Sequence, residues 1–222
     1  MALLSERGYS VLSMDQFTEW LRGSPRPSRP AALLTFDHCY DSQLDSAVPV
    51  LEALKLRATF FPASAGLVHE LPDVAADSRD TLLALAKAGH TIGCHTHNHP
   101  VLTRLSPTHV RRELLGSKLA LEDALGQRVG AFCYPYGAYD ARVREIVQET
   151  GFEVAFTVDL GVVNPGNDPY LLRRVPILGE PSSAEFGVYL SGKFLVSGSL
   201  LLYWKVRERV LDRKASEPEP EG

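Results

Sequence analysis

The amino-acid sequence predicts a single α/β domain built on a parallel sheet, with a closed barrel favoured over an open sheet. Short apolar runs of strand length alternate with segments of helical spacing from about residue 31 to residue 190. Strands that alternate with helices form parallel sheets with right-handed crossovers. The length of 222 residues suits one domain with a substantial core. In such a fold, chemistry is expected at the carboxyl ends of the strands.

The individual elements follow from these patterns in chain order. Strands are predicted at residues 31–36, 58–61, 91–94, 131–134, 154–158 and 174–178. Helices are predicted at residues 45–55, 81–88, 107–125 and 140–150. The longest helix has the clearest ends, because Ser106 and Pro107 stand at its start and Gly126 follows its end.

Two flanks differ from the central segment, residues 31–192, which we expect to be the catalytic domain. Residues 1–30 contain a helix-like stretch at 14–21, followed by a linker rich in proline and arginine. Residues 193–222 contain a helix of mixed apolar and basic residues at 200–214 and a tail rich in proline and glutamate, expected to be disordered. The helix at 200–214 is expected to pack on the domain; the alternative is that it rests on a membrane surface.

Composition excludes several classes of function. The net charge is −4, from 23 basic and 27 acidic residues, and no basic patch indicates a nucleic-acid partner. The three cysteines argue against a disulfide framework, although a single bridge is compatible with them. The first residues do not form a secretory signal, and no apolar run is long enough to span a bilayer. We therefore expect a cytoplasmic protein as the sequence is written, or an extracellular or cell-envelope protein if its start is truncated.

Three histidines fall within five residues, at His95, His97 and His99. Histidine is a common metal ligand, and zinc sites often take two ligands from one short segment. Because Gly93 and Pro100 flank the cluster, we expect a strand end that turns into a loop. A lone histidine is usually a satisfied or exposed residue, but three at a strand end favour a metal site. We expect His95 and His99 to bind the metal and His97 to point elsewhere.

A neighbouring strand end supplies the other groups that a catalytic metal site needs. Such a site needs a third protein ligand, an open position for water and a base that takes the proton of that water. Asp37 and His38 follow the first predicted strand and provide one residue of each type. Taken alone, Asp37 would be interpreted as a turn or helix-cap residue, but beside the histidine cluster it is a candidate base.

At these residues the sequence resembles the polysaccharide deacetylase family, also called the fourth carbohydrate esterase family or the NodB homology domain. Residues 35–40 read Thr-Phe-Asp-His-Cys-Tyr, similar to the family's Thr-Phe-Asp-Asp-Gly-Tyr. Residues 95–99 match His-Ser/Thr-x-x-His, and residues 135–137 match Pro-Tyr-Gly. Residues 172–174, Leu-Arg-Arg, resemble a later Leu-Pro-Arg segment. The resemblance covers roughly residues 7–190 in order.

The resemblance implies a distorted, TIM-like (β/α) barrel of seven strands that binds a divalent metal, often zinc, and removes acetyl groups from N-acetylated glycans. It makes Asp37 the catalytic base and His95 and His99 metal ligands. The backbone N–H of Tyr136 would contribute to the oxyanion hole. Arg174 matches an arginine that orients the base, and a carboxylate paired in this way stays ionised.

The sequence departs from the family pattern at three places. His38 replaces the aspartate that is normally the third metal ligand; histidine can bind zinc, so we expect a site of three histidines. Cys39 replaces a glycine, and cysteine would be strained there if the position needs a positive φ. The family's late Leu-x-His, whose histidine acts as general acid, is absent after His109. Some branches place an arginine where this chain has Cys133.

Three functions are compatible with these residues. The first is a hydrolase that removes N-acetyl, or alternatively O-acetyl, groups from a glycan containing N-acetylhexosamine. The second is a glycan-binding protein of the same fold that has lost the metal through the change at His38. The third is an amide hydrolase that acts on a small substrate other than a sugar. A metal bound tightly by the chain would exclude the second.

Overall fold

The computed structural model describes residues 1–68, 78–177 and 181–191. The strands are β1 (Ser10–Val11), β2 (Ala31–Ala32), β3 (Thr35–Asp37), β4 (Thr59–Phe61), β5 (Thr91–Ile92), β6 (Ala131–Cys133), β7 (Val154–Leu160) and β8 (Leu172–Arg174). The α-helices are α1 (Ala2–Glu6), α2 (Met14–Leu21), α3 (Asp41–Ala53), α4 (Arg79–Lys87), α5 (Pro107–Leu125), α6 (Ala141–Glu149) and α7 (Ser183–Leu190). Short 3₁₀ helices lie at Ser64–Val68, Leu102–Arg104 and Pro135–Gly137.

The strands from β3 to β8 are parallel neighbours in the order of the chain. β3, β4 and β5 pair in sequence, as do β6, β7 and β8. A parallel bridge between Cys94 and Phe132 joins the two groups, with the Cys94 N–H donating to the Ala131 carbonyl at 2.9 Å. A strand order that never reverses is typical of a barrel, whereas a doubly wound sheet has a point where the order switches.

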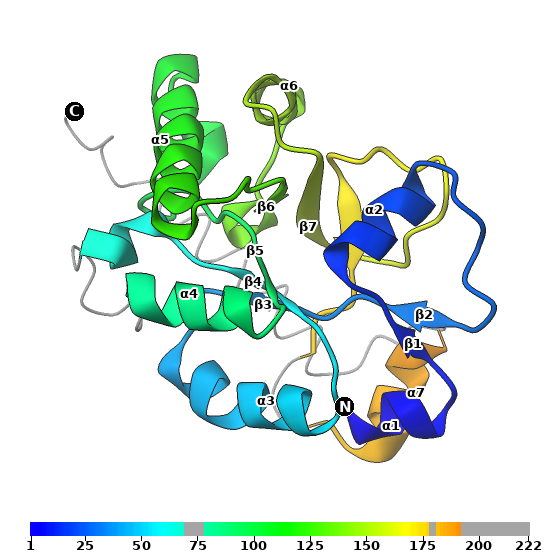
Figure 1. Cartoon of the computed structure of the whole chain (residues 1–222). Coiled ribbons are helices and arrows are strands. Elements are labelled where there is room, and N and C mark those ends of the chain that lie inside the picture. The colour runs from blue at the N-terminus through cyan, green and yellow to red at the C-terminus, as the bar shows by residue number, and fades with distance from the viewer. Residues whose placement is uncertain (69–77, 178–180, 192–222) are drawn as a thin grey trace.

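The strands separate two apolar clusters. Consecutive residues of a strand point to opposite faces, and helices α3 to α6 follow one another around the outside of the strands (Figure 1). The outer cluster, between strands and helices, includes Phe60, Phe132 and Ala155 of the strands and Leu51, Leu85, Leu114 and Val143 of the helices. The inner cluster consists of Met14, Phe17, Phe61, Ala131, Cys133, Val154, Phe156 and Leu172.

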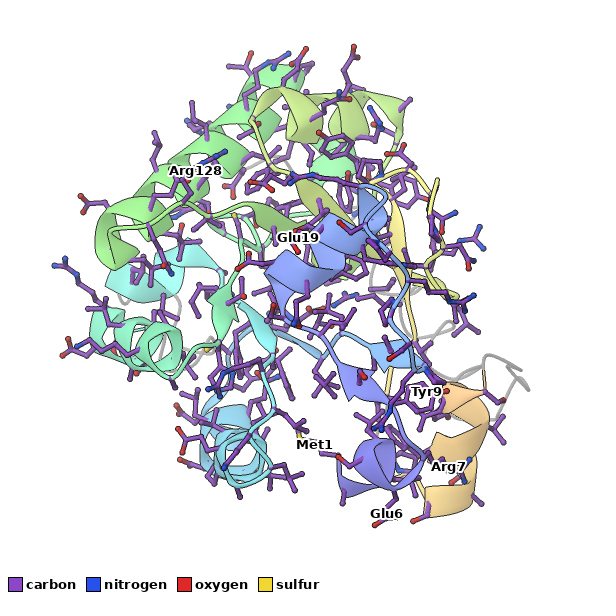
Figure 2. All side chains as sticks on the ribbon, turned by 45° about the vertical axis from the view of Figure 1, so that its right-hand side comes forward. Met1, Glu6, Arg7, Tyr9, Glu19 and Arg128 are labelled. Atoms are coloured by element: carbon purple, nitrogen blue, oxygen red, sulfur yellow. The ribbon has the colours of Figure 1, made fainter. Side chains whose placement is uncertain are left out.

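The N-terminal residues pack against the two apolar clusters and against α7, the last helix in the described part of the chain. The helix predicted at 14–21 is confirmed as α2, which places Met14 and Phe17 in the inner cluster. β1 pairs with β2. α1 lies beside α7, where the Tyr9 hydroxyl donates to the Leu190 carbonyl and the Arg7 guanidinium lies close to Gly187 (Figures 1 and 2). The predicted boundary at residue 30 stays a prediction, and the predicted helix and tail at 193–222 lie outside the described residues.

Helix ends follow the local signals in the sequence. The Ser106 hydroxyl accepts a hydrogen bond from the His109 N–H at 3.3 Å, Pro107 occupies the first turn of α5, and Gly126 ends the helix with φ of 67°. In α6 the Asp140 carboxylate accepts from the Val143 N–H at 2.7 Å. Among the described residues, none of the helices is long and apolar enough to cross a membrane.

Two predicted strands differ from the structure. The strand expected at residues 31–36 is two short strands, β2 and β3, which pair with different neighbours. The last strand was expected at residues 174–178, but β8 is Leu172–Arg174. Leu172 is fully buried in the inner cluster, and this contact fixes the strand two residues earlier. Arg174 ends the strand, residues 175–177 have no regular structure, and Pro176 lacks an N–H for a ladder hydrogen bond. Residue 178 lies outside the described part of the chain.

The close packing of the inner face gives a stability prediction. A Cβ atom on Gly93 would lie 2.3 Å from the Phe61 ring and 3.0 Å from the Ala131 carbonyl oxygen. Gly93→Ala is therefore expected to lower the free energy of unfolding by about 2 kcal/mol, measured by urea denaturation. Gly116→Ala is the control, because it lies within α5 with nothing within 4 Å of the added methyl group. This change should raise the free energy of unfolding by roughly 0.5–1 kcal/mol. Equal stability of both variants would contradict the packing described.

Candidate metal centre and catalytic base

The residues proposed from the sequence meet at the carboxyl ends of the strands, on the inner face. Asp37 is the last residue of β3 and Arg174 the last residue of β8. His95 follows β5 two residues after Gly93, and both point inward because Cys94 between them belongs to the outer cluster. Parallel strands end at one edge of the sheet, so side chains from β3, β5 and β8 converge there.

Three histidines form a compact group at this edge. The side chains of His38, His95 and His99 offer nitrogen atoms that all lie within 4.8 Å of one another. The Nε2 atoms of His95 and His99 are 3.1 Å apart. His97 lies apart from this group, with its Nδ1 atom 2.7 Å from the Ser64 hydroxyl. The expected loop after a strand end is present, and it separates His97 from the other two.

The orientation of His95 is fixed by the backbone. Its Nδ1 atom lies 2.7 Å from the carbonyl oxygen of Cys133. A carbonyl oxygen only accepts hydrogen bonds, so Nδ1 carries the proton and Nε2 presents a lone pair to His99 and His38. A backbone carbonyl that orients a ligand histidine in this way is a common feature of metal sites.

The histidine group fits a divalent cation. Two nitrogen atoms that each lie about 2.05 Å from one tetrahedral ion are roughly 3.3 Å apart, and the His95 and His99 Nε2 atoms are separated by 3.1 Å. Burial lowers the pKa of His95 to about 4 and lowers the pKa of His38 from its ordinary value. Both rings are therefore neutral at pH 7, as metal binding requires.

Asp37 is held by Arg174 in a bidentate ion pair. The Nη1 and Nη2 atoms of Arg174 donate to the two carboxylate oxygens at 2.7 Å and 2.8 Å. Burial raises the pKa of Asp37, but the charge and hydrogen bonds of Arg174 together lower it by more than burial raises it. The pKa therefore lies well below its usual range. Asp37 is ionised, and one of its oxygens lies within 4.8 Å of a His95 nitrogen. An ionised carboxylate therefore lies beside the histidine group.

The guanidinium of Arg174 is itself fixed by three further contacts. Nε donates to the Thr157 carbonyl at 2.8 Å, and Nη1 donates to the Thr35 hydroxyl at 3.2 Å. Nη2 lies 3.1 Å from the Cys133 sulfur. Arg174 thus connects β8 with β3, β6 and β7, and the direction of the Asp37 carboxylate depends on the sheet as a whole.

Left-handed backbone conformations are concentrated at this site. Of the six non-glycine residues with positive φ in the described ranges, all but Lys55 belong to it. Such conformations are strained for L-residues and persist where the surrounding structure fixes them. The five are His38 (73°), Cys39 (57°), Thr96 (69°), His99 (54°) and Tyr136 (56°).

A sequence model of the family described as polysaccharide deacetylase matches residues 24–155, more than half of the chain. The chain belongs to the polysaccharide deacetylase family.

YxkH of Bacillus subtilis is 28% identical over 192 residues, which cover 86% of this chain and 67% of YxkH. Chitin deacetylase 2 of Saccharomyces cerevisiae is 30% identical over 119 residues, 54% of this chain and 35% of the yeast protein. The chain thus spans two thirds of one relative and about a third of the other.

Solved structures confirm the fold. The Streptococcus pyogenes deacetylase PplD, solved in complex with acetate, superimposes with a TM-score of 0.78 and 24% identity over 87% of this chain and 84% of its own. The chain therefore has the distorted (β/α) barrel fold of polysaccharide deacetylases, as the resemblance in the sequence implied, and its described strands β3 to β8 form one parallel run of six.

The two departures at residues 38 and 39 share one turn. Both residues have positive φ, so the position that is glycine in the family motif does need a left-handed backbone. Cys39 is fully buried in the outer cluster, and its thiol is not part of the histidine group. The same turn brings the His38 ring within 5.0 Å of the His95 ring and 4.6 Å of the His99 ring, measured between centroids.

The third family motif turns the chain beside the histidines. Tyr136 has φ of 56°, and its ring centroid lies 4.5 Å from that of His99. A Cβ atom on the next residue, Gly137, would lie 2.3 Å from the Val158 side chain, so the turn needs glycine there. The assignment of the Tyr136 N–H to an oxyanion hole stays a prediction.

The sequence did not reveal the role of Cys133. It was noted only as standing where some branches have an arginine. Its sulfur lies 3.1 Å from the Arg174 Nη2 atom and 3.5 Å from an Asp37 oxygen, so it packs against the ion pair. The alternation of side chains along β6 could have indicated this position. Phe132 and Tyr134 on either side belong to the outer cluster, so Cys133 faces the inside of the barrel.

The thiols at and near the site should be unreactive in the native protein. Cys39, Cys94 and Cys133 are all buried, and none of the three forms a disulfide bond. Burial raises the pKa of Cys94 to about 11 and raises that of Cys133 well above its ordinary value. We expect no labelling by iodoacetamide at pH 8 without denaturant and three labels per chain in urea, counted by mass spectrometry. Rapid native labelling of Cys133 would contradict its position behind the ion pair.

Proposed function

We propose that this protein is a metal-dependent hydrolase that removes N-acetyl groups from a glycan containing N-acetylhexosamine. One observation carries the proposal: an ionised carboxylate, Asp37, lies beside a group of three histidines and is aimed by a bidentate arginine. The family supports it, since relatives of this chain include proteins named chitin deacetylase. On this basis we propose that the substrate of this chain is also a glycan and that its metal is zinc.

His38, His95 and His99 would hold the ion and leave a position open to solvent, as in catalytic sites with three protein ligands. A divalent cation bound there would supply a Lewis acid, which polarises a carbonyl group and lowers the pKa of water. The proton transfers and the binding of the oxyanion would be carried out by side chains and backbone groups of the chain itself.

Asp37 would take the proton of the attacking water as general base. Because Arg174 occupies both of its oxygens from one side, Asp37 stays ionised and presents the same face to each substrate. The Tyr136 N–H would donate to the oxyanion that forms from the acetyl carbonyl, and such a donor typically contributes about 3 kcal/mol to the transition state. In the absence of a late histidine, Asp37 would also return the proton to the departing amine.

Metal analysis tests the first part of the proposal. Protein purified without chelator should contain about one zinc per chain by elemental analysis. His38→Ala and His95→Ala should each lose it, whereas His109→Ala, which removes a histidine outside the group, should keep it. A parent protein without metal after dialysis against zinc would exclude the proposed mechanism and favour a glycan-binding protein. Loss in His95→Ala alone would exclude His38 as a ligand.

Acetate release tests the second part. Asp37→Asn should keep zinc but release acetate from N-acetylglucosamine tetramer roughly 10²–10⁴-fold more slowly than the parent, because the amide cannot accept a proton. Asp45→Asn is the matched control, since Asp45 is exposed on α3 and its substitution removes the same charge. Activity of the parent on small amides but not on the tetramer would favour the non-sugar hydrolase, and activity on O-acetyl groups alone would favour an esterase.

A further inference from the structure

The loop that connects His95 and His99 must hold an unfavourable conformation. Thr96 and His99 both have positive φ, and the Nε2 atoms of His95 and His99 lie 3.1 Å apart. With a proton on one of these atoms the two rings share a hydrogen bond, whereas binding of a cation requires both lone pairs to point at the same position. Groups outside the rings that fix the loop would hold the rings in the arrangement that a cation needs.

Part of that support comes from the backbone and from the loop itself. The N–H groups of Ser64 and Ala65 donate to the carbonyl oxygens of Thr96 and His97 at 3.0 Å and 3.1 Å. The His99 N–H donates to the Thr96 hydroxyl at 3.0 Å. These bonds anchor the loop on the side of the 3₁₀ helix Ser64–Val68.

The other side of the loop is held by one carboxylate from α5. The Glu113 Oε2 atom accepts from the backbone N–H groups of His97 and Asn98, at 3.0 Å and 2.9 Å. Its Oε1 atom accepts from the Asn98 side-chain amide at 2.9 Å. Two consecutive N–H groups that donate to one oxygen fix the orientation of the peptide between them.

Glu113 is also presented from a rigid support. It lies on the α5 helix, whose residues Val110, Leu114 and Ser117 are fully buried on either side of it. Within the described part of the chain, its hydrogen bonds go to His97 and Asn98, the two residues in the middle of the loop, and none goes to a candidate ligand. A carboxylate in this place acts on the histidines only through the course of the backbone.

We infer that Glu113 is a positioning residue for the metal centre: it fixes residues 97 and 98 so that His99 is held against His95 in the geometry that binds a cation. The inference rests on the proposed function as a metal site. Outer partners of metal ligands typically change metal affinity 10- to 100-fold when they are removed.

A pair of conservative substitutions separates position from charge. Glu113→Gln keeps the length of the side chain, so its carbonyl oxygen still reaches both backbone N–H groups, and the Asn98 amide can rotate to pair with the new amide. Glu113→Asp keeps the charge but is shorter by one methylene group and withdraws the carboxylate from the loop. Zinc affinity, measured by competition with a chromophoric chelator, should fall at least tenfold in Glu113→Asp and stay within about threefold in Glu113→Gln.

Asp123→Ala is the control, because it removes an exposed carboxylate from the same helix and should leave the affinity unchanged. The reverse order, with zinc affinity lost in Glu113→Gln and kept in Glu113→Asp, would overturn the inference, because it would show that charge alone matters. Equal affinity in all variants would overturn it as well.

Amide hydrogen exchange on the metal-free protein provides a second readout. The His97 and Asn98 amides should exchange slowly in the parent and in Glu113→Gln, and much faster in Glu113→Asp. Fast exchange in the parent would contradict the hydrogen bonds to Glu113. If the parent binds no zinc, the proposed function fails, whereas amides protected in the parent and in Glu113→Gln but not in Glu113→Asp would still show that Glu113 holds the loop.

Discussion

The ion pair between Arg174 and Asp37 connects the architecture of the barrel with its chemistry. Asp37 ends the first strand of the six-stranded parallel run and Arg174 ends the last, so the contact between them joins the two ends of that run. The arginine also reaches the carbonyl of Thr157 and the hydroxyl of Thr35. The Asp37 carboxyl is half-buried, and the charge and hydrogen bonds of the arginine hold its pKa well below its usual range. The same ion pair therefore joins the ends of the strand run and keeps Asp37, the proposed base, ionised.

The three histidines of the proposed metal site are supported differently. Its histidines are carried by segments with left-handed backbone at His38, Thr96 and His99, conformations that the residues themselves disfavour. The conformations persist because contacts from neighbouring elements fix them, such as the bond from the His38 N–H to the Phe61 carbonyl at 3.0 Å. Strain in the loops and rigidity in the strands thus occur together at one edge of the barrel.

Much of the fold and of the candidate site was accessible to sequence reasoning because the signals were local. The ends of α5 are encoded by Ser106 and Gly126, next to the helix they limit. The histidine cluster and the motif around Asp37 each occupy a few consecutive residues. β8 was placed too late because its position is set by the burial of Leu172 among distant strands. Glu113 gave no signal, since a glutamate on an amphipathic helix usually faces water and its partners lie 15 or more residues away.

The hydrogen bond from His95 to the carbonyl of Cys133 has a consequence for how this position can vary. Its acceptor belongs to the main chain, so the tautomer of His95 is independent of the side chain at residue 133. An arginine, a cysteine or another residue there changes what lies against Asp37, while the His95 ring keeps its protonation and orientation. The side chain at residue 133 can therefore differ among homologues without a matching change at the proposed ligand His95.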